Sequence, residues 1–574
     1  MATSYGGIQA DCWERVLDPE QLSRALKDVQ QLLDICGVPS ISLGILHHGQ
    51  VILRESVGFR NVEREFRADS DTKYLIGSVS KTFLAALAAI ADSEGRLKLQ
   101  EPCVVIRPAR PSTPSDSSEH PSSYERPLEP SDSVPGTNGF DLTLCRYLLG
   151  LRDVHSNDRS RRRTMGKQWV YDNTAYGLIP LALEAAYSQG YSSLLKDKIL
   201  IPLGLRNTAV NLEDCATDEE NVAFPYIQLA SGSFRRLRNS LTDERNPHVL
   251  GVMGMRSSVN DLLTWANSVM GEGTAEGQGQ SQTQSILRAV AATRKPFWTW
   301  RQGDAKTWSS CMGWTKTTMP TSRFGALSYN FAAAEHRLLE PDKYIVGNNA
   351  TAGKTILQSN GTVYGSNSGL YTFPDTQSAI VVCSNGLTNG DAADWAARIM
   401  THALFNLPRI DFLELARVEA AARRAKFEAM LAEWHRGHEP SPHTSSNLLK
   451  FVDVYSRLET TLTIRARSKL DINPTSDGDN NRPTLQVVFN NVESSQGDLI
   501  FYKENTLSFF PTSRDEWLSD QMIDWDFTDS GLFYFSSDPS SEYLNSDGYS
   551  GRMSSLTWKW DENESPTVFT RVEV

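Results

Sequence analysis

Eight short runs that alternate apolar and polar residues follow one another between residue 448 and residue 574. Each run is bounded by Asn, Asp, Ser, Gly or Pro, and this pattern is typical of strands in an antiparallel sandwich or small barrel. The pattern therefore predicts a separate all-β, barrel-like domain over 448–574. Its many aromatic residues are expected in the core, because alternation buries one face of each strand, although a ligand cavity is the alternative.

Residues 1–410 have a different order of elements. Residues 41–58 form two β-rich runs around His48 and Gly49, which predicts a hairpin, whereas 174–200 and 258–270 have helical spacing. This order predicts an α/β (α+β) domain over 1–410, with an antiparallel sheet sandwiched by helices and a helical subdomain. Residues 411–447 are predicted to be a helical connector and linker. A chain of 574 residues is long enough for two or more such domains.

A stretch at about 104–139 interrupts the first domain. Residues 108–135 contain seven prolines and eight serines, and such a composition cannot bury enough apolar surface to offset the entropy of ordering. We predict a disordered insertion.

The net charge of −12 argues against binding to nucleic acid through phosphate neutralisation. The seven cysteines contain no C-x-x-C pair and are interpreted as reduced thiols, and no apolar run reaches 18 residues. We therefore expect a cytoplasmic protein without a membrane segment. The sequence does not indicate an oligomeric state.

Ser78 and Lys81 form an S-x-x-K pair at the start of a predicted apolar helix. Residues at i and i+3 share one helix face, so the lysine can activate the serine hydroxyl as a base. Ser193 and Lys196 have the same spacing, but their amphipathic context favours a solvated helix face. A buried structural lysine paired with a carboxylate is the alternative for Lys81, because only a lowered pKa would make it a base near neutral pH.

Two further segments supply residues for the same chemistry. In W-V-Y-D-N, Tyr171 can relay a proton, and Asn173 can orient Lys81 and bind a substrate carbonyl. Tyr543 and Asn545 repeat the Y-x-N spacing, where a turn explains it.

In the segment 358–369, Gly361 would let a strand edge approach the substrate. The amide of Thr362 could then join that of Ser78 in an oxyanion hole, although a plain Gly-rich hairpin is the alternative. Other chemistries lack their motifs, since the chain has no G-x-S-x-G, H-E-x-x-H or G-x-x-x-x-G-K-S/T.

Taken in order, several segments resemble the β-lactamase-related serine hydrolases of the class C β-lactamase and penicillin-binding-protein type, especially their fungal members. The matching segments are I-G-S-V-S-K-T-F (76–83), W-V-Y-D-N-T-A-Y-G (169–177), I-P-L-G-L-R-N-T (201–208), G-M-R-S-S-V-N-D-L-L-T-W (254–265), C-M-G-W (311–314) and S-N-G-T-V-Y-G (359–365).

The resemblance implies a β-lactamase/transpeptidase-like fold and an acyl-enzyme on Ser78, with Lys81 and Tyr171 moving protons. It also implies that the reaction needs no metal or organic cofactor and that 448–574 is a lipocalin-like domain. Two departures stand out. Ser359 lies where relatives carry the His of His-x-Gly or the Lys of Lys-Thr-Gly, and residues 104–168 replace a leucine-rich segment that forms part of the site's wall.

We therefore expect a serine hydrolase that cleaves an ester or amide of a small acylated metabolite, within fungal secondary metabolism. Transfer of the acyl group to an alcohol or amine is a close alternative, because the chain also resembles lovastatin-type acyltransferases. A catalytically inactive binding scaffold is the alternative from another class, motivated by Ser359 and the altered wall.

Overall fold

The computed structural model describes most of the chain. The described residues are 18–99, 171, 173–210, 220–237, 250–271, 282–302, 305–331, 341–439, 445–457, 460–466, 485–490, 496–519, 527–537, 552–559, 565–572. They fall into two compact units that divide between Ala421 and Ala422. The predicted insertion at 104–139 lies outside the described residues.

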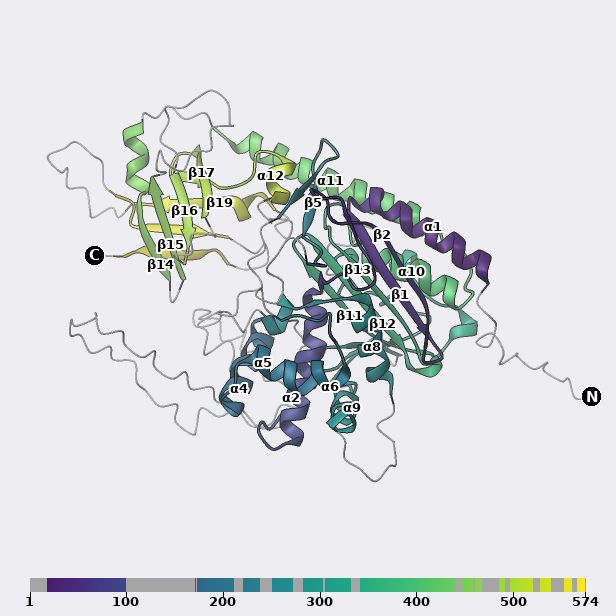
Figure 1. Ribbon diagram of the computed structural model, residues 1–574. Coiled ribbons are helices and arrows are strands. Elements are labelled where there is room, and N and C mark those ends of the chain that lie inside the picture. The colour runs from purple at the N-terminus through teal and green to yellow at the C-terminus, as the bar shows by residue number, and fades with distance from the viewer. Residues whose placement is uncertain are drawn as a thin grey trace, which may run out of the picture. The chain divides into compact units, whose positions relative to one another are not determined.

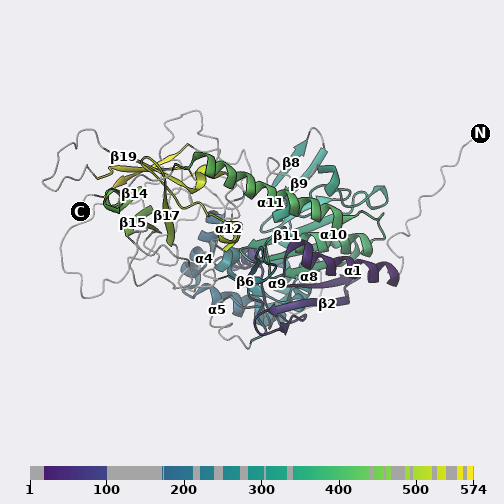
Figure 2. The same cartoon turned by 90° about the horizontal axis from the view of Figure 1, so that it is seen from above.

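The first unit is built on an antiparallel sheet of nine strands within the described residues, in the order β3-β2-β1-β13-β12-β11-β10-β9-β8. Figure 2 shows β8 and β9 at the end of the sheet away from β2. The bounds are β1 Ser40–His47, β2 Gln50–Asn61, β3 Phe66–Arg67, β8 Trp298–Gln302, β9 Ala305–Ser310, β10 Thr315–Thr318, β11 Thr355–Val363, β12 Ser366–Phe373 and β13 Ser378–Ser384.

The hairpin predicted around His48 and Gly49 is confirmed. Both residues have positive φ, 50° and 73°, and a two-residue turn with that geometry matches the twist of the strands β1 and β2 that it joins.

Helices cover both faces of this sheet (Figure 1). Strand β13 shows why, because Ala379, Val381 and Cys383 pack on one face and Ile380 and Val382 on the other, so both faces are apolar. One face packs against α1 (Pro19–Cys36) and α10 (Ala392–Leu404). The other packs against α8 (Val259–Met270), whose core also contains α2 (Ser80–Ser93) and α9 (Gln282–Thr293). The predicted sandwich of helices around an antiparallel sheet is confirmed.

A further group of helical elements packs beside α2. It contains α4 (Asn173–Tyr187), α5 (Tyr191–Leu195), the π-helices Lys196–Leu200 and Leu250–Gly254, and α6 (Ile201–Leu203). Leu183, Leu194 and Ile199 join the same core as α2, so this group corresponds to the predicted helical subdomain.

The described part of 411–447, the segment expected to be a helical connector and linker, contains α11 (Phe412–Gly437) and the start of the 3-10 helix Ser445–Phe451. Phe412 and Leu413 are buried in the first unit, whereas Phe427 stacks with Phe510 and Trp434 donates to Ser508 Oγ in the second. The division at Ala421 therefore falls inside α11, and the helix supplies core residues to both units.

The second unit is a closed antiparallel barrel, as the alternating runs predicted. Among the described residues its strands are β14 Asp453–Arg457, β15 Thr460–Ala466, β16 Leu485–Phe489, β17 Gln496–Lys503, β18 Thr506–Ser508, β19 Leu532–Ser536, β20 Ser555–Trp558 and β21 Thr567–Arg571. Strand β14 was missed by the pattern, and the run at 522–527 lies mostly outside the described residues. A short helix, α12 (Arg514–Ser519), was not predicted.

Several of the barrel's described aromatic residues pack into its core. Tyr455, Phe509, Phe533 and Phe569 are all at most 5% exposed and belong to one hydrophobic cluster. This arrangement agrees with the expectation that alternation places them in a core.

No helix in the described ranges is long and apolar enough to span a bilayer. Within the same ranges no group of three His, Cys, Asp or Glu side chains is arranged to hold a metal ion.

Candidate active site

Ser78 lies in a single 3-10 turn, Gly77–Val79, that leads directly into α2. Every residue of α2 from Ser80 to Ala91 is buried, as its apolar sequence predicted. Gly77 has φ +50°, a value that an L-residue rarely adopts, so glycine allows the sharp entry into the helix. Ser78 is half-buried and stands at the N-terminal end of a buried helix.

The turn that carries Ser78 is held by strand β12 on one side. Ser366 Oγ donates to the carbonyl oxygen of Leu75 at 2.9 Å, and Ser368 Oγ donates to that of Ile76 at 2.7 Å. Both hydroxyls are buried, and their hydrogen bonds link the backbone of the turn to β12. The nucleophile turn is thus fixed to the central sheet.

Lys81 is the base candidate, and its side chain is 2% exposed. Its Nζ donates to Ser78 Oγ at 2.7 Å and to the carbonyl oxygen of Val252 at 3.2 Å. Burial lowers the pKa of Lys81 well below its usual value, and no carboxylate of the described residues forms an ion pair with it. The contacts of Lys81 among the described residues therefore do not match the alternative, a structural lysine paired with a carboxylate.

Two aromatic rings favour the protonated form of Lys81 and so oppose the effect of burial on its pKa. Nζ lies 5.0 Å from the ring centre of Tyr171 and 5.5 Å from that of Tyr176, and a ring face stabilises an ammonium ion by about 0.5–2 kcal/mol. Complete burial of an ammonium group costs several kcal/mol, so desolvation outweighs the rings and favours the neutral amine.

Tyr171 completes a three-residue group. Its hydroxyl donates to Ser78 Oγ at 2.7 Å, and burial raises the pKa of the phenol. Tyr171 therefore stays protonated near neutral pH and can donate a hydrogen bond or a proton. The structure brings Ser78, Lys81 and Tyr171 together from segments that are 90 residues apart in sequence.

Strand β11 approaches the same turn. A Cβ placed on Gly361 would overlap the carbonyl oxygen of Ile76, and one placed on Gly77 would lie 2.9 Å from the backbone nitrogen of Thr362. Glycine at both positions allows this close approach of two backbones. Ser359 lies on the same face of β11 as Gly361, since the side chains of a strand alternate.

The remaining predicted residue and the two rival motifs lie elsewhere or outside the described residues. Asn173 is exposed at the first residue of α4, and within the described residues it is not among the hydrogen-bond partners of Lys81. Ser193 and Lys196 are exposed, as expected for a solvated helix face. Tyr543 and Asn545 lie outside the described residues.

Sequence reasoning missed three groups that shape this site. Val252 contributes its carbonyl oxygen from the π-helix Leu250–Gly254, and π-helical turns often occur at functional sites. Tyr176 faces Lys81 and accepts from the amide of Gly313 at 3.2 Å. The alternation of Ser366 and Ser368 was the one available signal, because two hydroxyls on a buried strand face require partners.

A sequence model of the beta-lactamase family matches residues 26–404, which is well over half of the chain. The chain belongs to the beta-lactamase family. The family membership agrees with the predicted beta-lactamase/transpeptidase-like fold, which the nine-stranded sheet of the described residues and its two helical layers form.

Two relatives illustrate how distant this beta-lactamase family member is. It is 23% identical to protein flp of Staphylococcus aureus (strain MW2) over 237 residues, which are 40% of this chain and 45% of flp. It is 22% identical to a beta-lactamase of Psychrobacter immobilis over 298 residues, which are 52% of this chain and 66% of that protein. The chain thus spans about half the length of the first curated relatives that it matches.

Proposed function

We propose that this protein is a serine hydrolase that cleaves an ester or amide of a small acylated metabolite through an acyl-enzyme on Ser78. The observation that carries the proposal is the pair of 2.7 Å contacts that Ser78 Oγ makes with Lys81 Nζ and Tyr171 Oη. Serine needs a base to attack a carbonyl, and a buried amine with a lowered pKa is such a base. The resemblance to fungal relatives suggests a role in secondary metabolism.

In the acylation step, neutral Lys81 accepts the proton of Ser78 as Oγ forms a bond to the carbonyl carbon of the substrate. For this transfer the Ser78 hydroxyl donates to the lone pair of the neutral Nζ, the reverse of the direction in the resting contact, while Nζ keeps its hydrogen bond to the Val252 carbonyl. The negative charge that develops on the carbonyl oxygen is stabilised by the amides of Ser78 and Thr362.

Collapse of the tetrahedral intermediate breaks the bond to the leaving group. The proton held by Lys81 passes to the leaving oxygen or nitrogen, with the protonated phenol of Tyr171 as the relay. Water then attacks the acyl carbon as Lys81 accepts its proton. The bond between Ser78 Oγ and the acyl carbon breaks, Lys81 returns the proton to Oγ, and the acid product leaves with Ser78 and neutral Lys81 restored. Each step uses only this chain's residues and water.

The residue at position 359 bears on the substrate class. Ser359 offers a neutral hydroxyl at the position where the family resemblance implies a lysine or a histidine. This hydroxyl can donate a hydrogen bond to a substrate carboxylate, but it carries no positive charge with which to form an ion pair. We therefore favour an acyl donor that carries no charge on the part that lies beside Ser359.

The test is a mass spectrum of the intact protein after incubation with a fluorophosphonate, together with the burst of p-nitrophenol released from p-nitrophenyl acetate. We expect one adduct per chain on Ser78, which is lost in Ser78→Ala. Ser193→Ala is the matched control, because it removes the serine of the exposed S-x-x-K pair and should leave the adduct intact. An adduct that persists in Ser78→Ala, or none in the wild type, would refute the proposal.

Acyl transfer is the alternative outcome of the same assay. If an added alcohol raises p-nitrophenol turnover and yields a new ester, transfer to an acceptor dominates over hydrolysis. A p-nitrophenyl ester with a carboxylate on its acyl chain should react no faster than its neutral analogue if Ser359 acts as argued.

A further inference from the structure

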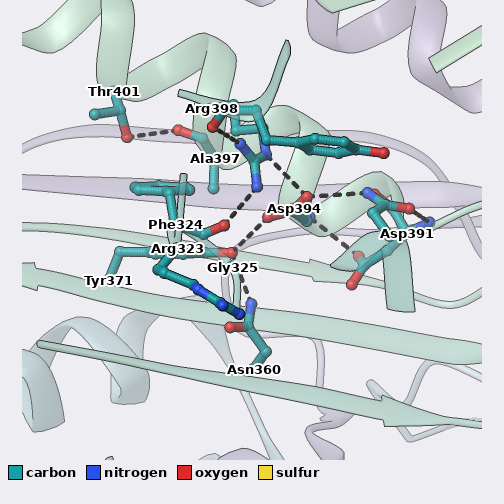
Figure 3. Close-up of polar contacts among 12 residues, drawn as sticks. Arg323, Phe324, Gly325, Asn360, Tyr371, Asp391, Asp394, Ala397, Arg398 and Thr401 are labelled. Atoms are coloured by element: carbon teal, nitrogen blue, oxygen red, sulfur yellow. Dashed lines mark hydrogen bonds and ion pairs between the residues drawn. The ribbon is translucent and has the colours of Figure 1, made fainter. Parts of the chain in front are cut away.

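A buried polar network lies behind the strand that approaches Ser78 (Figure 3). Its centre is the ion pair between Arg398 Nε and Asp394 Oδ2 at 3.0 Å, with both side chains fully buried. The other guanidinium nitrogens of Arg398 donate to the carbonyl oxygens of Tyr344 at 2.8 Å and Phe324 at 2.5 Å. A buried ion pair with this many partners is costly to break, because loss of one partner leaves an uncompensated charge.

The network reaches the active-site strand through a tyrosine. Tyr371 Oη donates to Asp394 Oδ1 at 3.1 Å and accepts from Asn360 Nδ2 at 2.7 Å. Burial and the negative charge of Asp394 raise the pKa of Tyr371 well above its usual value, so it remains a donor to that carboxylate. Asn360 is the residue between Ser359 and Gly361.

The alternation of side chains along β11 determines which face of the sheet Asn360 lies on. Leu357 packs in the core beside α2, and Ile356 packs in the core beside α10, so even-numbered positions face α10. Gln358 follows the same rule: its Oε1 accepts from the amide of Gly325 and its Nε2 donates to the carbonyl of Arg323. Two consecutive α10-facing side chains of β11 are therefore fixed by polar contacts behind the active site.

Two glycines leave the space that this network occupies. Gly369 lies opposite Asn360 in the strand register, and a Cβ there would lie 2.6 Å from Cε2 of Tyr371. A Cβ on Gly325 would overlap Asp394 Oδ1. The glycine at 369 leaves room for the ring of Tyr371 to reach Asn360 from β12. The glycine at 325 leaves room for Asp394 to contact its hydrogen-bond partners.

We propose that Tyr371 is a positioning residue for the reaction of Ser78, acting through Asn360 to hold Gly361 and the Thr362 amide against the nucleophile turn. This inference rests on the proposed function. It follows because Gly361 and Thr362 come directly after Asn360, and both lie within close contact of the turn at Ile76–Gly77. An oxyanion donor that shifts by a fraction of an ångström loses much of its effect.

The experiment compares Tyr371→Phe and the wild type for the burst rate of p-nitrophenyl acetate per fluorophosphonate-titrated site. The phenylalanine ring keeps its stack on Phe324, whose centroid lies 4.3 Å away, so the variant loses the hydroxyl and keeps the packing. Because removal of one oxyanion donor costs about 10²–10³-fold, a displaced donor should lower acylation about tenfold. KM and the midpoint of the pH profile should change little, because Lys81 keeps its contacts.

A double-mutant cycle with Asn360→Ala separates positioning from stability. The two substitutions should be non-additive in the logarithm of the acylation rate, since either one breaks the same contact. Gly369→Ala, which displaces the Tyr371 ring without removing a polar group, should lower the rate in the same way. Tyr455→Phe is the matched control, as it removes a buried hydroxyl that donates to Phe451 in the other unit.

The outcomes distinguish this inference from the proposed function. If the wild type forms no Ser78 adduct, the proposed function fails. If the wild type reacts and Tyr371→Phe reacts at the same rate per titrated site, the positioning role fails alone, even if that variant unfolds at lower denaturant. Additive effects of Tyr371→Phe and Asn360→Ala would also overturn it.

Discussion

The Nζ of Lys81 lies 3.2 Å from the carbonyl oxygen of Val252, a neutral partner where a buried lysine would ordinarily require a carboxylate. A neutral partner does little to offset the cost of burying an ammonium ion, and the pKa of Lys81 is accordingly lowered. The π-helix that carries Val252 thus positions the amine of Lys81 without stabilising its protonated form.

Replacement of Lys81 tests this relationship through pH. In the wild type, the acylation rate should rise with pH as Lys81 loses its proton, with a midpoint below the usual lysine value of about 10.4. Lys81→Ala should lower acylation by about 10²–10⁴-fold. Stopped-flow burst rates between pH 5 and 10 measure both effects, and an unchanged rate in the variant would assign the base to another residue.

The lowered pKa also has a consequence for stability. A lysine whose folded-state pKa is depressed binds fewer protons folded than unfolded, so its contribution to the free energy of unfolding becomes more favourable as pH rises toward the unfolded value. Lys81→Met removes this titration. Denaturant titrations should therefore show the variant gaining stability relative to the wild type as pH falls, and a constant difference would contradict a depressed pKa.

Gly361→Ala tests the close approach of β11 to the nucleophile turn. The new Cβ would overlap the carbonyl oxygen of Ile76, so either β11 or the turn must move. We expect a loss of about 1–3 kcal/mol in the free energy of unfolding and a fall in acylation of at least tenfold. Gly190→Ala is the control, because nothing lies within 4 Å of its Cβ position and its φ is −61°.

Asp391 provides a pH test of the network behind β11. Burial, with the nearby Asp394 as a smaller cause, raises the pKa of Asp391 to about 8. Between about pH 4 and 8 the folded chain thus holds a proton that the unfolded chain has released. The contribution of Asp391 to the free energy of unfolding therefore falls by up to about 1.4 kcal/mol per pH unit as pH rises through this range.

Asp391→Asn should remove that slope and keep the cap of α10, since Asp391 Oδ1 accepts from the amide of Asp394 and an asparagine oxygen can do the same. The variant should gain stability relative to the wild type between pH 5 and 8 in chemical denaturation. Parallel curves for the two proteins over that range would show that Asp391 is ionised throughout.

Truncation tests the division between the two units. A chain that ends at Ala421 keeps Phe412, Leu413 and Ala416, which pack in the first unit, and removes the part of α11 that packs on the barrel. We expect this fragment to fold and to form the Ser78 adduct with the fluorophosphonate. A fragment that is unfolded by circular dichroism would show that the first unit depends on the rest of the chain.

The sequence by itself determined the architecture, because periodicity reports which faces are buried. Alternating runs predicted the barrel, and the apolar run after Ser78 predicted the buried helix α2. The spacing of Ser78 and Lys81 predicted their contact, since i and i+3 residues meet on any helix.

Only the tertiary structure decided which distant groups surround that pair. The approach of Tyr171, the Val252 carbonyl and the back-face link from Asn360 to Asp394 depend on packing between segments far apart in sequence. Periodicity carries no information about such contacts. Asn173 shows the same limit, because it lies two residues from Tyr171 and yet is exposed at the start of α4.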